Sequence, residues 1–198
     1  IPRDMCAEPY FNHEICKALY FNGLLGDELF SFPQKLRGLD LMGSHTAMPG
    51  TRHAVPFLAM ADVALNLGEL NYAEKLAYEA LEARGEAPMV LERLVLISIA
   101  KQRLETATIL LNAMRRIPFH REAASSLLEQ LKADSTGDTD AHVRHLRSLM
   151  LLEDYVERPT VFIRLDNLLK RNPSNHMAFE YRMAALLLNG DPAGAVQG

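Results

Sequence analysis

Histidines close to acidic residues are the side chains of this sequence that could do chemistry. His142 and His145 stand three residues apart in a segment with helical spacing, and Asp138 and Asp140 come just before them. Residues three apart share one face of a helix, so the two imidazoles could point toward one ion. A metal site needs three or four converging ligands, and no HEXXH motif or carboxylate–histidine pair completes this one. We interpret the aspartates as helix caps and the histidines as surface groups, and we expect neither a metal nor a cofactor.

Two further groups of polar residues invite a catalytic interpretation. His120 precedes Arg121 and Glu122, and His176 stands four residues before Glu180. A catalytic pair needs a nucleophile or a reacting group beside it, and the sequence identifies neither. We interpret both groups as polar helix faces and expect no catalytic residues.

The two cysteines, Cys6 and Cys16, are too few for a disulfide framework or a four-thiolate zinc site. Cys16 falls in a helical pattern, where we expect a small buried apolar side chain. The glycines do not form the GxxxxGK[ST] loop that holds phosphates. The cysteines leave the redox compartment open.

Composition narrows the class of protein. The chain has 198 residues, of which 48% are hydrophobic and 23% charged, close to the average of soluble globular domains. Lys and Arg number 21 against 25 Asp and Glu, a net charge of −4. Proteins that bind nucleic-acid phosphates usually carry a basic excess, so we expect no nucleic-acid partner. No apolar run approaches the roughly 20 residues that span a bilayer.

The elements that would position these residues are all helices. Apolar spacing and breakers predict helices over residues 10–24, 25–32, 54–67, 71–84, 88–101, 104–116, 119–132, 139–152, 160–171 and 175–189. No segment alternates with the period of two that marks a strand. Two irregular segments remain, a long loop over 33–52 and an acidic loop over 133–140, and a loop as long as the first is often functional or mobile.

Small residues recur at the same point of successive helix pairs. Ala73, Ala107, Ala141 and Ala178 are separated by 34, 34 and 37 residues. A period of about 34 with two helices per unit is the length of the tetratricopeptide repeat (TPR). The pattern is fullest over 54–87 and degenerate later. We therefore predict an all-α, TPR-like solenoid of helical hairpins, a right-handed α-α superhelix, with an irregular helical bundle as the alternative.

The repeat period also sets the predicted domains. Residues 1–53 form an N-terminal helical hairpin and long loop, and residues 54–198 form one continuous solenoid with units at 54–87, 88–121, 122–155 and 156–191. The chain begins at Ile1 and ends soon after Asp191-Pro192, a good helix start followed by less than two turns. We therefore expect a fragment of a longer protein.

Four segments carry a family resemblance. They are NGLLGDELFSFPQ (22–34), LNLGELNYAEKLAYEALEA (65–83), RLETATILLNAMRRIPFHREAA (103–124) and NPSNHMAFEYRMAALLLNGD (172–191). They resemble the C-terminal region of an uncharacterised family in Bacteroidetes, whose members look like multi-pass membrane proteins followed by a TPR-like helical domain. The family has no established activity, so no residue role is carried over. The resemblance implies a membrane-associated parent, attached through an N-terminal region outside this chain; this domain itself would be soluble, and the side of the membrane stays open.

If the repeat register holds, the first helices of the hairpins line a concave face. Its predicted binding residues are Leu58, Asp62, Leu65, Asn66, Glu92, Leu96 and Ile99. Mixed apolar and acidic groups would suit an extended peptide or a partner helix with some positive charge. We therefore expect a non-enzymatic protein-interaction domain whose partner protein is unidentified. The alternatives are a structural spacer that packs on its own membrane domain and, less favoured, an all-α hydrolase.

Overall fold

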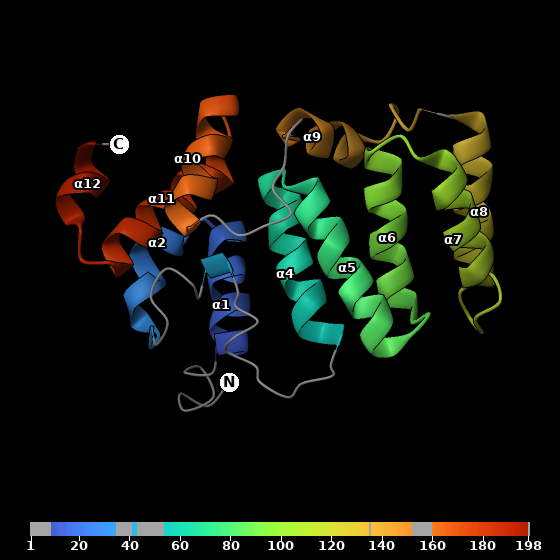
Figure 1. Cartoon of the computed structure of the whole chain (residues 1–198), viewed down its shortest axis with the longest axis horizontal. Coiled ribbons are helices and arrows are strands. Elements are labelled where there is room, and N and C mark those ends of the chain that lie inside the picture. Colours follow the sequence, from blue (N-terminus) through green and yellow to red (C-terminus); the bar gives the residue numbers. More distant parts are fainter. Residues whose placement is uncertain (1–8, 35–40, 43–53, 135, 152–159, 198) are drawn as a thin grey trace. The chain divides into compact units, whose positions relative to one another are not determined.

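Two groups of helices make up the described part of the chain, and each has its own buried residues (Figure 1). The computed structural model describes residues 9–34, 41–42, 54–134, 136–151 and 160–197. We call residues 52–156 the central unit, and residues 1–51 with 157–198 the terminal unit. Within the described ranges every regular element is a helix, so the predicted all-α class is confirmed there.

The central unit holds six helices among its described residues. They are α4 (Ala54–Leu67), α5 (Leu70–Arg84), α6 (Pro88–Ala100), α7 (Leu104–Met114), α8 (Arg121–Ala133) and α9 (Ala141–Leu149). From α4 to α8, each helix packs on the next one along the chain. The connections are short, so consecutive helices turn back on each other as antiparallel neighbours. These bounds agree with the predicted helices to within a few residues.

Helix starts follow the chemistry of their first residues. Pro88 opens α6 after Ala87, whose backbone is extended (φ −71°, ψ 141°). Proline suits this position because the first amide of a helix has no partner to lose. Before α9, the carboxylate of Asp140 accepts hydrogen bonds from the backbone N–H groups of His142 and Val143. The prediction that Asp140 caps a helix is therefore confirmed.

Small residues allow α4, α5 and α6 to approach closely. Ala61, Ala73 and Ala77 are fully buried in a cluster shared by these helices, and Leu76 is buried beside them. A second cluster joins α6, α7 and α8 and takes in Val143 of α9. Fully burying one leucine contributes about 1.5 to 3 kcal/mol, so each buried leucine of these clusters stabilises the unit substantially.

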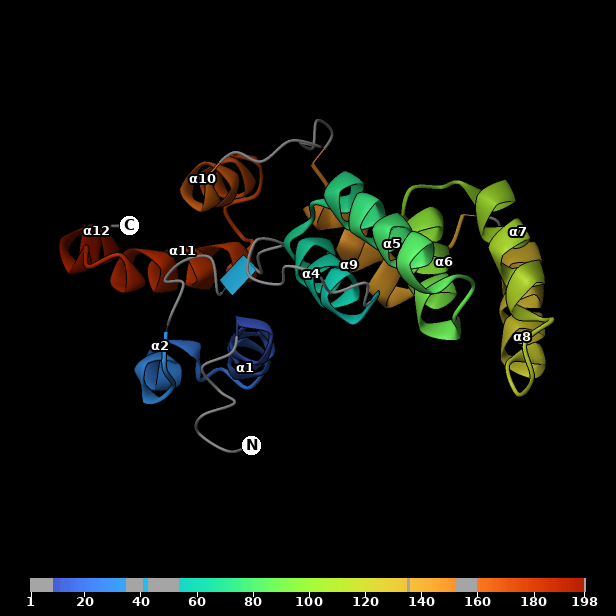
Figure 2. The same cartoon turned by 60° about the horizontal axis from the view of Figure 1, so that its bottom comes forward.

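Helix α9 departs from the repeat pattern. It crosses back over α4 and α6, as Figure 2 shows. Ala141 is exposed, whereas Ala73 and Ala107 are fully buried. The expected role of Ala141 as a packing residue of a third hairpin is therefore wrong. The reason is that α9 buries Val143, Leu146 and Leu149 instead, an apolar stripe three residues apart on one face.

The terminal unit combines helices from both ends of the chain. Its described helices are α1 (Pro9–Phe21), α2 (Leu25–Glu28), the 3₁₀ turn η2 (Leu29–Ser31), α10 (Val161–Arg171), α11 (His176–Leu188) and α12 (Pro192–Gln197). Thr160 and Asn175 cap α10 and α11 through side-chain oxygens. α10 packs on α11, and α11 packs on α2 and α12. The ring of Tyr181 is buried and meets Tyr20 edge-on, with ring centres 5.9 Å apart.

The boundaries of the two units separate the last predicted repeat from the ones before it. The central unit begins at residue 52, close to the predicted boundary at 53, while residues 157–198 group with the N-terminal segment. One continuous solenoid over 54–198 stays a prediction. The long loop predicted over 33–52 lies almost wholly outside the described residues. In the described ranges, no helix is both long and apolar enough to cross a membrane.

Candidate functional site

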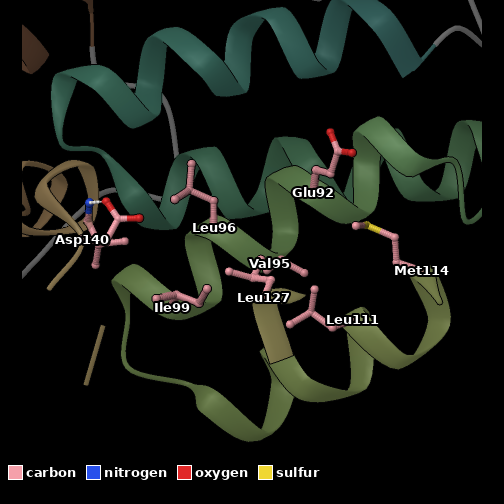
Figure 3. A pocket seen from close by; sticks show the side chains of 9 residues that line it. Glu92, Val95, Leu96, Ile99, Leu111, Met114, Leu127 and Asp140 are labelled. Atoms are coloured by element: carbon pink, nitrogen blue, oxygen red, sulfur yellow. Dashed lines mark hydrogen bonds between the residues drawn. The ribbon is translucent and has the colours of Figure 1, made fainter. Parts of the chain in front are cut away.

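An apolar pocket opens between helices of the central unit. Its volume is about 140 Å³. It is lined by Glu92, Val95, Leu96, Ile99, Leu111, Met114, Leu127, Asp140 and Val143. Figure 3 shows Glu92 and Met114 toward one end of the pocket and Ile99 and Asp140 toward the other. We call this hollow the α6–α8 pocket.

Helical spacing places the lining side chains. On α6, Glu92, Leu96 and Ile99 follow each other at steps of four and three residues, so they share one face. On α7, Leu111 and Met114 are three apart and both buried. Leu127 of α8 and Val143 of α9 complete the walls. The pocket is therefore the space that the apolar side chains leave unfilled where these four helices meet.

The two carboxylates of the pocket differ in what they can do. Asp140 accepts the N–H groups of His142 and Val143 at 2.7 and 3.2 Å, so its charge is directed to the start of α9. Glu92 has 56% of its side chain exposed, and one of its oxygens lies 3.7 Å from Nδ1 of His120. Asp140 is exposed as well, so a cationic ligand could reach either carboxylate, but only that of Asp140 also binds backbone N–H groups at a helix start.

The size and lining of the pocket define its chemistry. An apolar cavity of about 150 Å³ holds one benzene molecule, so this pocket has room for one aromatic or branched aliphatic side chain. Its described lining contains no imidazole, hydroxyl or thiol. The arrangement suits binding of an apolar group next to a positive charge.

Three of the predicted binding residues line this pocket, and four do not. Glu92, Leu96 and Ile99 belong to its walls. Leu58 and Leu65 are buried in the cluster of α4, α5 and α6, so they do not present a binding surface as expected. The last two, Asp62 and Asn66, lie on α4 and are half-buried.

The charge expected from Asp62 is already compensated. One of its carboxylate oxygens lies 2.6 Å from the guanidinium of Arg93, which joins α4 to α6. The side chain of Asn66 donates to the backbone oxygen of Asp62 at 2.7 Å. The predicted acidic face along α4 is therefore an internal ion pair, which sequence spacing could not reveal because Arg93 lies one hairpin away.

Helix α9 takes the place beside α4 and α6 where a ligand was expected. Leu146 is fully buried and shares the cluster that contains Leu65. Arg147 donates to the backbone oxygens of Ile99 and Ala100 at 2.8 and 3.1 Å. Part of the predicted face is thus covered by the chain itself, and the α6–α8 pocket is the part that stays open.

The other residues considered for chemistry are separated by the fold. His142 and His145 are exposed, and Asp138 accepts a hydrogen bond from Arg147 at 2.5 Å. In the described ranges no three His, Cys, Asp or Glu side chains come together as a metal site would require. His176 is exposed and Glu180 is half-buried on α11.

The terminal unit buries several polar groups around α1. Cys16 is fully buried, as predicted, and lies 3.7 Å from Oδ1 of Asn12. Nδ1 of His13 lies 3.1 Å from the backbone oxygen of Leu41. Burial raises the pKa of Tyr181 well above its usual value, and the negative charge that Cys16 can carry adds to this shift. Cys6 lies outside the described residues.

Sequence spacing missed most of the pocket. Leu111, Met114, Leu127 and Val143 come from helices that the repeat register did not assign to the binding face. One signal was present, because Met114 stands where the repeat pattern has a small residue. A long flexible side chain at such a position indicates that neighbouring helices are spread apart.

A family model matches most of the chain. The family model that matches residues 16–197 is described as a family of unknown function (DUF6057). No curated protein matches the chain, and no solved structure does so. The match does not bear on the TPR-like character, the source or the membrane attachment expected from the sequence.

Proposed function

The chain belongs to DUF6057, a family of unknown function, and we propose from its own geometry that it is a non-enzymatic protein-binding domain. Its ligand is a segment of a partner protein that carries a large apolar side chain next to basic residues. The apolar side chain enters the α6–α8 pocket. The basic groups meet the exposed carboxylate of Glu92.

The observation that carries this proposal is the contrast between the pocket walls and its rim. Val95, Leu111 and Met114 are each at most 4% exposed, so the walls are apolar and firmly packed. Placing a phenylalanine there contributes about 1.5 to 3 kcal/mol. An exposed ion pair with Glu92 adds at most about 1 kcal/mol. The apolar group therefore sets the affinity and the charge sets the orientation, and one such contact alone corresponds to weak binding near the millimolar range.

We extend the proposal to the architecture and the parent protein. The helix pairs α4–α5 and α6–α7 of the central unit, with Ala73 and Ala107 buried 34 residues apart, support hairpins of the TPR-like kind. A larger, membrane-anchored parent is supported by the sequence resemblance alone. Binding at the pocket requires neither the TPR-like architecture nor the membrane-anchored parent.

The test uses short capped peptides and the methyl signals of the protein. We would add acetyl-Arg-Phe-Arg-amide to the chain labelled with ¹³C at its methionine methyl groups. The Met114 methyl should shift progressively as its surroundings gain an aromatic ring. Met89 lies on α6 but is exposed and does not line the pocket, so its methyl should stay in place.

Two altered peptides separate the apolar and the charged contributions. Acetyl-Arg-Ala-Arg-amide should leave Met114 unshifted because it has no group to fill the pocket. Acetyl-Glu-Phe-Glu-amide should bind several-fold more weakly because its charges face Glu92. The proposal would be contradicted if the Met114 methyl signal did not shift with Arg-Phe-Arg at millimolar concentration, or if it shifted equally with all three peptides.

A further inference from the structure

Phe119 lies in the connection between α7 and α8 with its ring in solvent. Its relative exposure is 102%, the highest among the large exposed apolar side chains of the described residues. Its backbone is in the left-handed region, with φ at +67°. A bulky residue rarely adopts this conformation, which is strained for side chains with a Cβ atom. Both the exposure and the strain are unfavourable for an isolated chain, and together they indicate a group held out for a contact.

The residues around Phe119 are mostly basic, with Glu122 as the acidic exception. Arg115, Arg116 and Arg121 are all exposed and lie within four residues of it. The α6–α8 pocket has the opposite character, since its polar lining residues are Glu92 and Asp140. An aromatic ring between arginines is the ligand that the proposed function describes, and this chain carries one.

Phe119 and the α6–α8 pocket lie at the same edge of the central unit. Nδ1 of His120, the residue after Phe119, is 3.7 Å from a carboxylate oxygen of Glu92 at the pocket. Met114, the last residue of α7, also lies at this end (Figure 3). Phe119 does not fill its own pocket, because its ring is fully exposed. A surface that carries a projecting group beside a matching hollow can pair with a copy of itself about a twofold axis.

We propose that the occupant of the α6–α8 pocket is Phe119 of a second copy of this chain, and that two copies exchange these rings reciprocally. This inference rests on the proposed function, since it names the partner whose side chain enters the pocket. A pocket of about 140 Å³ matches one phenyl ring in size. The arginines of each loop face the carboxylates beside the other copy's pocket.

Phe119→Gly removes the ring that is proposed to enter the other copy's pocket, without harming the fold. Glycine is at ease at positive φ, so this variant should fold at least as well as the parent chain. In sedimentation velocity over a wide concentration range, the parent chain should approach the mass of a dimer. Phe119→Gly should dimerise at least tenfold more weakly. Gln102→Gly is the matched control, because Gln102 is exposed and has φ at +58°, and its dimerisation should be unchanged.

A second pair of variants tests the α6–α8 pocket as the site that receives the ring. Leu127→Trp fills the pocket with a larger side chain from its own wall, and Glu92→Arg reverses the charge at an exposed position if the first variant folds poorly. Each should dimerise more weakly than the parent chain. Mixing Phe119→Gly with Leu127→Trp should restore a dimer, because one intact ring can still enter one intact pocket. Restoration by mixing is not expected if either change acts only by damaging the fold.

Other outcomes overturn the inference in recognisable ways. A parent chain that stays monomeric, or that grows beyond a dimer, excludes reciprocal exchange. Equal association of Phe119→Gly and Gln102→Gly excludes Phe119 as the donor. If Arg-Phe-Arg still shifts the Met114 methyl in those cases, the pocket binds another partner and only this inference fails. If the peptide also has no effect, the proposed function fails as well.

Discussion

The guanidinium of Arg147 donates to the backbone oxygen of Ile99 over 2.8 Å and so joins α9 to the end of α6. The same side chain reaches the oxygen of Ala100 at 3.1 Å and the carboxylate of Asp138 at 2.5 Å. The last carbonyl groups of a helix have no partner within it and attract positive charge. Arg147 therefore caps α6 and holds α9 across it at the same time.

Arg147→Ala should lower the free energy of unfolding by about 2 kcal/mol, since it leaves partly buried carbonyl groups without a charged donor. Urea denaturation would measure the change. Arg144→Ala on the same helix is the control, because the side chain of Arg144 is exposed and its one described hydrogen bond goes to the backbone oxygen of Asp138. Its effect should stay within about 0.5 kcal/mol. Equal losses in the two variants would mean that Arg147 does not hold α9 in place.

Gly68→Ala should be strongly destabilising. Gly68 has φ at +96°, and a Cβ atom there would overlap the carbonyl group of Leu149. Gly85 also has positive φ, at +72°, but a Cβ atom there would meet nothing within 4 Å. With ψ at −159°, Gly85 lies in a backbone region that essentially only glycine adopts, so Gly85→Ala carries a conformational cost of about 1 to 3 kcal/mol. Gly68→Ala should exceed it by about 2 kcal/mol because packed backbone must move. Thermal unfolding of both variants would show whether the close approach of Leu149 matters.

The contribution of Asp134 to the stability of the fold, through the loop before α9, should depend on pH. Hydrogen bonds from the hydroxyl and the backbone N–H of Thr139, and then from Thr136, hold the pKa of Asp134 far below its ordinary value. A carboxyl whose pKa is lower in the folded than in the unfolded chain stabilises the fold above its unfolded pKa, about 4. This contribution is lost as the pH falls through the folded pKa.

Comparison with Asp134→Asn would isolate that effect. The difference in stability between the parent chain and the variant should be present at pH 7 and shrink steadily below about pH 4. The experiment would follow unfolding at several pH values in constant ionic strength. A difference that is the same at pH 7 and pH 3 would show that the charge of Asp134 has no part in ordering the loop.

Leu111→Ala should enlarge the α6–α8 pocket. Leu111 is fully buried, and removing such a side chain costs about 2 to 5 kcal/mol. The larger space should then prefer acetyl-Arg-naphthylalanine-Arg-amide over the phenylalanine peptide. Ile109→Ala is the control on the same helix, since Ile109 is 69% exposed and outside the pocket lining. An unchanged peptide preference in Leu111→Ala would place the binding site elsewhere.

Helix positions in this chain could be predicted well because their signals are local. Proline at the start of α6 and aspartate before α9 act within a few residues of where they stand. The buried Ala73 and Ala107 likewise reflect packing between helices that are neighbours along the chain. Local patterns therefore sufficed for the elements and for the first two hairpins.

The path of α9 and the shape of the pocket could not be predicted in the same way. The contact between Arg147 and Ile99 joins residues 48 positions apart, and no spacing rule connects them. The ion pair of Asp62 with Arg93 likewise depends on how two hairpins stack. Three of the seven predicted binding residues line the pocket, and all three lie on α6. The four on α4 are buried or engaged by contacts within the chain, such as the cluster around Leu65 and the Asp62–Arg93 ion pair.

The backbone hydrogen bond from Leu151 to Gly68 has a consequence for synthesis of the protein. The turn between α4 and α5 is synthesised more than eighty residues before the residue that bonds to it. Contacts between such distant positions form slowly because a long stretch of chain must first be closed. The nascent protein therefore exposes the apolar edge of its first hairpin during translation, until the segment that covers it has been made.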